Sequence, residues 1–377
     1  MPRRIPLMLL IALLPGLLLA SPRARNLGIP FQGEVGLNNA ITDVPGVTVG
    51  QATVQSGSAV RTGVTAILPR GKIYDPVYAG WHTLNANGEL TGLHWIRESG
   101  FLEGPVLLTN THSVGAVHEG ALQWKLEENY FEGGLAALPV IGETWDGFLN
   151  DINGFHVRPH HAVEALSSAT DGPVEEGNVG GGTGMVCFRF KGGIGTASRI
   201  ISIDETAYTV GVLVQANFGR RSDLRIRGVP VGQQLAESYL PEEKKLVPPP
   251  PGGNSIICII ATDAPLLPHQ LDRVAQRGTI GVARTGGTGK NSSGDFFLAF
   301  STANPGAWKA SSIYTAQALP NGSIDAVFDA TIEATEEAIL NALVAARTLT
   351  GREGNTAYEI PHNTLLRLFQ RKAEPNE

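Results

Sequence analysis

The residues of this chain that are best placed for chemistry surround Ser255. Four prolines, residues 248–251, and the pair Gly252-Gly253 precede it, and an apolar run at 256–261 follows it. Prolines favour an extended backbone, glycines allow the backbone to change direction, and the apolar run predicts a buried strand. Cleavage before Ser255 would put a hydroxyl and a free α-amine on one residue, and an α-amine with a pKa of about 8 can accept the hydroxyl proton at neutral pH. The segment therefore predicts a self-generated N-terminal nucleophile, with a plain loop leading into a core strand as the alternative.

The other candidate motifs give weaker signals. The glycine-rich runs 177–184 and 191–199 do not have the spacing G-x-G-x-x-G before a helix, and Arg284–Asn291 resembles a phosphate-binding loop only at its Gly-Lys pair. The histidines form no HExxH motif or other zinc-ligand set, so we expect no metal and no cofactor. The corner Asn217-Phe218-Gly219 ends an apolar run, and it is either a simple turn or the position of an amide donor at the edge of a cleft.

Length, charge and the first residues limit the class of protein. A chain of 377 residues allows two domains or one large layered domain, and a formal net charge of -6 excludes a basic nucleic-acid footprint. Residues 1–20 have the pattern of a signal peptide, because Arg3-Arg4 precede the apolar run Leu7–Leu19 and a cleavage point falls before Ser21. That run is too short and broken for a membrane span. We therefore expect a periplasmic or secreted protein with no membrane association in its mature form.

A framework of short strands and longer helices must position these candidates. Strands are predicted at 41–49 around a Pro-Gly turn, and at 61–69, 185–190, 200–203, 208–219, 255–262 and 296–301. Helices are predicted after a cap at Asn110 or Thr111, at 265–277, and at 324–349, where an alanine stripe indicates close helix packing. This pattern favours a layered α+β fold in which helices cover two central sheets. Cys187 and Cys258 are expected as two separate buried thiols, with a disulfide between them as the alternative.

Seven segments together resemble the family of L-aminopeptidase/D-amidase-esterases and β-peptidyl aminopeptidases. They are 41–49, 108–115, 143–153, 177–184, 214–219, 253–263 and 286–304, in the family's order and across essentially all of the mature chain. The resemblance implies a four-layer αββα sandwich, similar to N-terminal-nucleophile hydrolases but with the connectivity of this family and of ornithine acetyltransferase. It also implies a precursor that cuts itself. The large fragment 21–254 and the small fragment 255–377 would then stay together as one catalytic domain and assemble into tetramers.

Carried over to this sequence, the resemblance implies a cut between Asn254 and Ser255, after which Ser255 is the catalytic nucleophile. Ser293 and Asp295 match the serine and the acid that support its proton transfer, although Asp295 is one methylene shorter than the glutamate of some members. Without the resemblance, the residues alone indicate a turn serine at 293 and a solvent-exposed charge at 295.

The resemblance also implies three residues that contact the substrate. Asn217 matches the asparagine that helps to hold the oxyanion, and Glu143 matches the carboxylate that receives the free amino group of the substrate. Trp145 stands where an L-aminopeptidase member carries tyrosine. That aromatic difference leaves the preference among β-residues and L- or D-α-residues open.

The function implied is that of a self-processing serine aminopeptidase. It would remove N-terminal residues from short peptides, amides or esters through an acyl-enzyme on Ser255, without a metal or cofactor. Two alternatives from other classes are a non-catalytic periplasmic protein that binds amines or peptides, and an acyltransferase of the ornithine acetyltransferase type. A serine nucleophile and an export signal both weigh against the acyltransferase, because acetyl donors are cytoplasmic metabolites.

Overall fold

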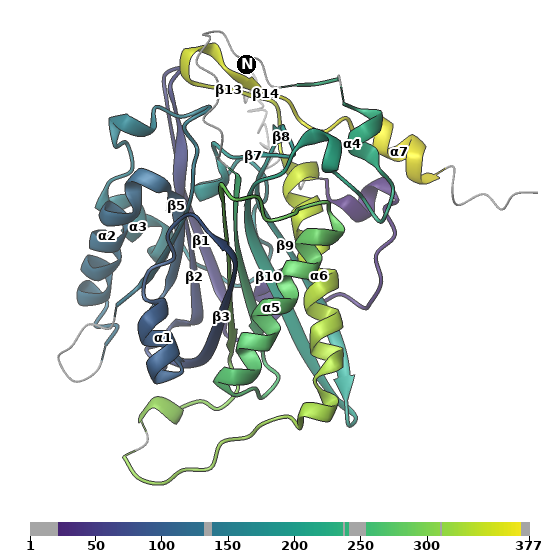
Figure 1. Ribbon diagram of the computed structural model, residues 1–377. Helices are drawn as coiled ribbons and strands as arrows, with labels where there is room; N and C mark the ends of the chain where they lie inside the picture. The colour runs from purple at the N-terminus through teal and green to yellow at the C-terminus, as the bar shows by residue number, and fades with distance from the viewer. Residues whose placement is uncertain (1–21, 132–137, 237, 241–253, 310, 371–377) are drawn as a thin grey trace, which may run out of the picture.

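The computed structural model describes residues 22–131, 138–236, 238–240, 254–309 and 311–370. The predicted signal peptide at 1–20, and the prolines and glycines of 248–253, lie outside the described residues. Two sheets lie face to face, and helices cover the outer face of each, as Figure 1 shows. The fold is therefore the predicted α+β sandwich of four layers, αββα.

The smaller sheet has four strands in the order β1-β2-β5-β6. Their bounds are Thr48–Ser56, Val60–Lys72, Val106–Asn110 and Val140–Thr144. Helices α2 (Val114–Glu127) and α3 (Pro159–Ser167) pack on its outer face around the buried Trp124. The predicted cap is confirmed at Asn110, whose side chain accepts a hydrogen bond from the His112 backbone at the start of the short 3-10 turn that precedes α2.

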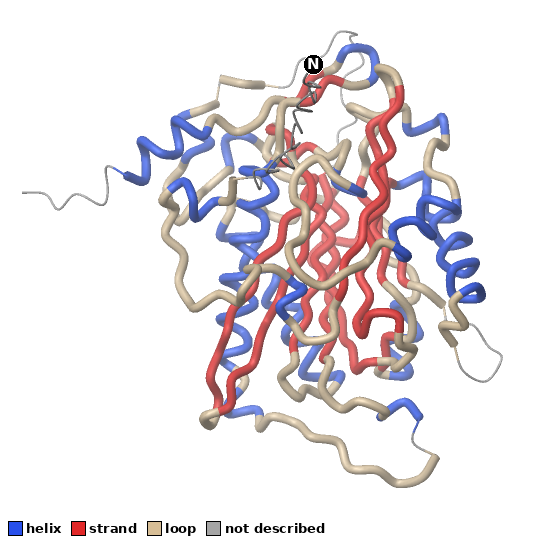
Figure 2. The backbone as a smooth tube through the Cα atoms, turned by 180° about the vertical axis from the view of Figure 1, so that it is seen from behind, coloured by secondary structure: helices blue, strands red, loops and turns tan. Residues whose placement is uncertain are grey.

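The larger sheet has six strands in the order β4-β3-β12-β11-β10-β9. Their bounds in that order are Phe101–Leu102, Val77–Ala86, Ser293–Ser301, Asn254–Thr262, Thr206–Asn217 and Gly193–Ile203. Helices α5 (Pro268–Arg284) and α6 (Asp325–Ala345) cover its outer face. Seen from behind, the strands fill the middle of the molecule and helices flank them on both sides (Figure 2).

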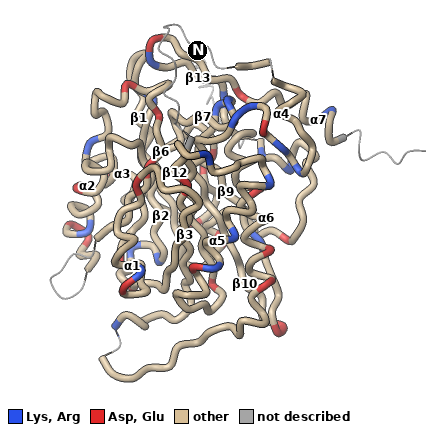
Figure 3. Tube along the Cα trace, viewed as in Figure 1, with Lys and Arg blue, Asp and Glu red and all other residues tan. Residues whose placement is uncertain are grey.

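Smaller elements complete the described chain. They are α1 (Leu93–Ser99), β7 (Val186–Cys187), β8 (Phe190–Lys191), α4 (Val231–Gln234), β13 (Leu349–Thr350), β14 (Thr356–Ala357) and α7 (His362–Gln370). None of the helices in the described ranges is long and apolar enough to cross a membrane. Acidic and basic residues are interspersed along the trace (Figure 3), in line with a net charge of only -6.

Strand β11 lies in the interior because it is apolar on both faces. Ile257, Ile259 and Ala261 belong to the core between the two sheets, whereas Ile256, Cys258 and Ile260 belong to the core beneath α5 and α6. A strand covered on both faces needs a continuous apolar run instead of alternation, and β11 has one. The position of Ser255 at the beginning of this run therefore follows from the sequence pattern.

Helix α6 confirms that its alanine stripe serves close packing. A side chain at Gly195 of β9 would come within 2.0 Å of the Ala338 carbonyl oxygen, so helix and strand touch through their backbones. Small residues on both elements allow this approach. The two cysteines are likewise confirmed as free and buried, in β7 and β11.

Other local predictions need correction. The predicted strand at 185–190 is two short strands, because Phe188 and Arg189 adopt positive φ and turn the chain between β7 and β8. The first half of 41–49 is a 3-10 turn at Ile41–Asp43. Helix α5 begins and ends later than predicted, since Pro268 occupies its first turn and the helix continues to Arg284.

Candidate active site

Ser255 lies near the start of β11, between an antiparallel and a parallel neighbour. It is opposite Asn217 of β10 and Gly294 of β12 in the strand register. Its side chain is 7% exposed, and its Oγ accepts a hydrogen bond from the Gly294 backbone N–H at 3.2 Å. Side chains alternate along a strand, so Ser255 shares a face with Ile257. The hydroxyl therefore faces the space between the two sheets.

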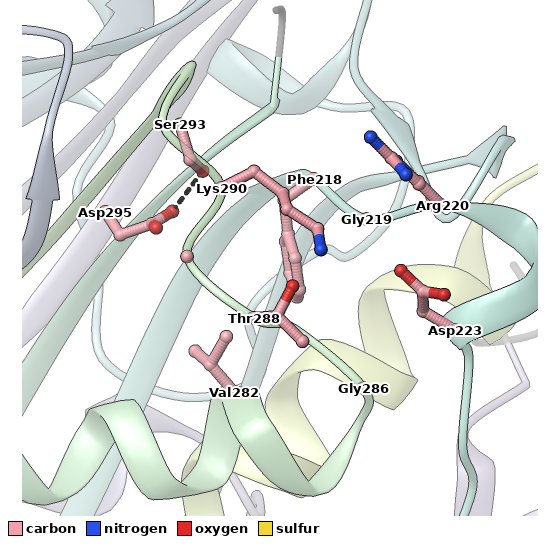
Figure 4. Close-up of a pocket in the computed structure, with 11 residues that line it drawn as sticks. Phe218, Gly219, Arg220, Asp223, Val282, Gly286, Thr288, Lys290, Ser293 and Asp295 are labelled. Atoms are coloured by element: carbon pink, nitrogen blue, oxygen red, sulfur yellow. Dashed lines mark hydrogen bonds between the residues drawn. The ribbon is translucent and has the colours of Figure 1, made fainter.

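Ser293 and Asp295 begin the neighbouring strand β12, and both are buried. The Ser293 hydroxyl donates a hydrogen bond to Asp295 Oδ1 at 2.6 Å (Figure 4). Strand register pairs Ser293 with Asn254 and thus puts it beside the bond between Asn254 and Ser255. Both side chains share the face of Phe297, which belongs to the core under α5 and α6. The pair therefore flanks the backbone of Ser255 from the face opposite its hydroxyl.

These positions correct the interpretation that the residues alone gave, a turn serine and a solvent-exposed acid. Burial raises the pKa of Asp295 to about 6, against the hydrogen bonds from Ser293 and the Ile256 backbone, which lower it. A carboxyl group with such a pKa is ionised at neutral pH and can hold the Ser293 proton. The pair can thus polarise whatever the Ser293 oxygen contacts.

We expect Asp295→Asn to change the pH dependence of stability. Because the folded pKa is raised, the stabilisation from the Asp295 proton is full below about pH 4 and is lost as the pH rises through about 6. Asparagine does not titrate, so the variant does not lose stability in this way. Its free energy of unfolding, compared with that of the unsubstituted protein at the same pH, should therefore rise by roughly 2 to 3 kcal/mol from pH 4 to pH 8. Urea unfolding at both pH values, at one protein concentration, measures this. The exposed Asp329→Asn is the control, and a pH-independent difference for Asp295→Asn would contradict the assignment.

Asn217 ends β10 with its carboxamide held at both ends. Its Oδ1 accepts a hydrogen bond from the Val186 N–H at 2.8 Å, and its Nδ2 donates to the Trp145 carbonyl oxygen at 2.8 Å. A backbone N–H only donates and a carbonyl only accepts, so the orientation of the amide is fixed. Asn217 lies opposite Ser255 and on the same face. An N–H donor group is thus positioned next to the hydroxyl, as an oxyanion site requires.

Lys191 supports this arrangement, although the sequence interpretation did not include it. Its Nζ donates hydrogen bonds to the carbonyl oxygens of Gly182 at 3.2 Å, Met185 at 2.8 Å and Gly192 at 2.7 Å. Burial lowers the pKa of Lys191 to about 7. The three carbonyl oxygens match the three N–H groups of an ammonium and so favour its charged form. The lysine holds the loop that presents the Val186 N–H to Asn217. A lone lysine in an apolar and glycine-rich run is the sequence signal that could have found it.

Glu143, in β6 of the smaller sheet, is a buried acid that is 4% exposed. Its Oε1 accepts a hydrogen bond from the Glu89 N–H at 3.0 Å, and its Oε2 accepts one from the Thr111 hydroxyl. Burial raises its pKa, and these two hydrogen bonds lower it. Within the described residues no lysine, arginine or histidine forms an ion pair with it. A buried carboxylate with this environment can receive a cation from outside the chain.

Gly88 connects Glu143 with the surroundings of Ser255. A side chain at Gly88 would come within 2.7 Å of Glu143 Oε1 and 3.6 Å of the Gly294 Cα. The acid and the residue that hydrogen-bonds Ser255 therefore both lie against the space that a side chain at position 88 would fill. Trp145, two residues beyond Glu143, is half-buried and contributes its backbone carbonyl to the support of Asn217. The structure thus brings all the predicted site residues to one end of the two sheets.

The chain matches the model of peptidase family S58 over residues 39–357. It is 50% identical over 383 aligned residues to the beta-peptidyl aminopeptidase BapA of Sphingosinicella microcystinivorans, and this alignment covers 96% of each chain. The match extends over the whole described sandwich and all the site residues. The likeness is therefore not limited to single motifs.

Solved structures give the same result. The L-aminopeptidase D-Ala-esterase/amidase of Ochrobactrum anthropi, a prototype of the serine aminopeptidases with a variant of the Ntn hydrolase fold, superimposes with a TM-score of 0.85 and 42% identity. That match covers 93% of this chain and all of the other. A β-aminopeptidase of a Burkholderia species superimposes with a TM-score of 0.84 and 46% identity, over 94% of this chain and all of the other. The fold shown here is thus the Ntn-type fold of that prototype.

Proposed function

The chain belongs to peptidase family S58 and is a serine aminopeptidase, and from this premise we propose that Ser255 is its nucleophile, freed by a cut after Asn254. The observation that carries the proposal is the position of Ser255 on β11, opposite Asn217 and beside Ser293. The cut yields the fragments 21–254 and 255–377. Both contribute strands to the six-stranded sheet, so they remain one folded unit.

The cut itself needs only the chain's own groups and water. The Ser255 hydroxyl attacks the carbonyl carbon of Asn254, the bond from that carbon to the Ser255 nitrogen breaks, and the nitrogen takes the hydroxyl proton. Water then hydrolyses the resulting ester and leaves a carboxylate on Asn254 and a free amine on Ser255. The paired Ser293 and Asp295 flank the nitrogen that changes its partner. Because Ser293 donates its proton to Asp295, the Ser293 oxygen can accept a hydrogen bond from the new amine of Ser255.

Turnover repeats the same proton path with a substrate. The Ser255 amine accepts the hydroxyl proton while the oxygen attacks the substrate carbonyl carbon. Asn217 donates a hydrogen bond to the negative oxygen of the tetrahedral intermediate. The amine then gives its proton to the leaving nitrogen, and an acyl-enzyme on Ser255 remains for water to hydrolyse. No metal or cofactor takes part in this proposed sequence.

Glu143 is proposed to select substrates with a free N-terminal amine. An ammonium that enters the site between the sheets would meet the carboxylate held by Glu89 and Thr111. We propose peptides with an N-terminal β-residue as preferred substrates, because the 50% identical relative is named a beta-peptidyl aminopeptidase. Trp145 lies next to this site and is the residue most able to set the width of the acyl pocket.

We expect Glu143→Gln to lower kcat/KM for a β-homoalanyl p-nitroanilide by about 50- to 100-fold, because a charge-assisted hydrogen bond to the ammonium is lost. N-acetylation of the substrate should abolish hydrolysis by the unsubstituted enzyme. Glu164→Gln, an exposed acid on the outer helix α3, serves as the matched control and should have little effect. Equal rates for free and acetylated substrates would show that Glu143 does not bind the amine.

Export and assembly complete the proposal. The basic and apolar pattern of residues 1–20 supports a signal peptide and a periplasmic or secreted enzyme, and determination of the mature N-terminus tests it. A tetramer of cleaved units is proposed on the resemblance alone, and light scattering of the purified enzyme tests it. The comparisons do not favour the binding protein or the acyltransferase.

A further inference from the structure

A charged cavity adjoins the Ser293–Asp295 pair, and the function proposed above does not use it. It is a small, partly open cavity of about 20 Å³. Its walls come from the end of β10, the end of α5, the loop 286–290 and the start of β12. β10 ends and β12 begins at the end of the sheet where β11 begins. The cavity is therefore located at the same end as Ser255.

The charges of this cavity are separated along its length. Figure 4 shows Ser293 and Asp295 on one side, Arg220 and Asp223 on the other, and the Lys290 side chain between them. Among the described residues, neither Lys290 nor Arg220 forms an ion pair or a side-chain hydrogen bond. Asp223 accepts a hydrogen bond only from Ser222, at 3.0 Å. Two cations against one acid leave this end of the cavity with an excess of one positive charge.

The position of the leaving group connects this end with catalysis. In the proposed reaction the leaving nitrogen takes a proton from the Ser255 amine, so it must lie next to that amine. Ser293 and Asp295 flank the Ser255 backbone from the face on which the cavity lies. Glu143, in contrast, lies between the sheets on the opposite face. The leaving residue is therefore directed away from Glu143 and toward the cavity.

We propose that Lys290 and Arg220 bind the carboxylate of the residue that leaves, so that the enzyme prefers dipeptides with a free C-terminal carboxylate over the corresponding amides. This inference rests on the proposed function. In a dipeptide the carboxylate is separated from the scissile nitrogen by one carbon atom, and both cations have long, flexible side chains. A guanidinium and an ammonium are the usual protein partners of a carboxylate. The two charged ends of a short peptide would then be recognised by opposite charges on opposite faces of the sheet.

The test compares two substrates that differ only in that carboxylate: β-homoalanyl-leucine as the free acid and as the amide. The quantity measured is the ratio of kcat/KM for the acid to kcat/KM for the amide, because a general loss of activity cancels in it. We expect a ratio of tenfold or more for the unsubstituted enzyme. Lys290→Met and Arg220→Gln should each lower the ratio several-fold, mainly through KM for the acid, and the double variant should bring it near one.

Arg225→Gln is the matched control, since Arg225 is an exposed arginine of the same segment that does not line this cavity. It should leave the ratio unchanged. Added salt should lower the ratio for the unsubstituted enzyme, because exposed charges are screened. A ratio near one in an enzyme that still hydrolyses the p-nitroanilide would overturn this inference and leave the aminopeptidase standing. An uncut chain without turnover of any substrate would overturn both.

Discussion

Ser255→Ala should produce a folded, full-length chain without aminopeptidase activity, and this is the largest effect expected for any single substitution. In the proposed mechanism the hydroxyl attacks both the Asn254 carbonyl and the substrate, so its removal should prevent the cut and the acyl-enzyme together. By comparison with the removal of other serine nucleophiles, turnover should fall by more than about 10⁴-fold. Denaturing electrophoresis should show one band for the variant and two unequal bands for the unsubstituted protein.

The variant should fold normally, because Ser255 Oγ makes one hydrogen bond of 3.2 Å with the Gly294 N–H and alanine fits a buried strand. Ser292→Ala, in the turn before β12, is the matched control and should retain the cut and the activity. Ser255→Thr keeps a hydroxyl and should restore part of the cleavage. Full activity in an intact chain, as seen by mass spectrometry, would show that the amine of Ser255 is not the base.

Asn217→Ala is expected to have the second largest effect, a loss of about 10²- to 10³-fold in kcat with little change in KM. In the proposed mechanism its carboxamide stabilises the tetrahedral intermediate and not the bound substrate, and other oxyanion donors contribute about 3 to 4 kcal/mol. Steady-state kinetics with a p-nitroanilide measures this separation of kcat from KM. Self-cleavage should slow as well, because it passes through a similar intermediate.

Loss of fold must be distinguished from loss of the donor in this variant. Alanine leaves the Val186 N–H and the Trp145 carbonyl without their partner, which costs about 1 to 3 kcal/mol for each buried group. The thermal midpoint of each variant must therefore lie well above the assay temperature. Asn217→Asp keeps the shape but replaces the N–H donor group with an oxygen, so it should be no more active than the alanine variant. Near-normal kcat in a folded Asn217→Asp would exclude the oxyanion role.

Local sequence patterns predicted much of this fold correctly. The continuous apolar run after Ser255 indicated a strand buried on both faces, and the long alanine stripe indicated α6 and its tight packing. Both patterns report which faces of a single strand or helix are buried, and the residues of that element alone carry this information. The errors occurred where a turn interrupts an apolar run, as at Phe188 and Arg189, whose positive φ the apolar pattern does not reveal.

The sequence by itself determined where the segment of the proposed nucleophile lies and which strand and helices surround it, because hydrophobic periodicity is a local property of the chain. Only the tertiary structure decided that Ser293 and Asp295 are buried and paired, that Lys191 holds the support of Asn217, and which face of the sheet each candidate occupies. These features depend on the register between strands that are distant in the sequence. A shift of one residue would move every side chain to the other face, and no local pattern specifies that pairing.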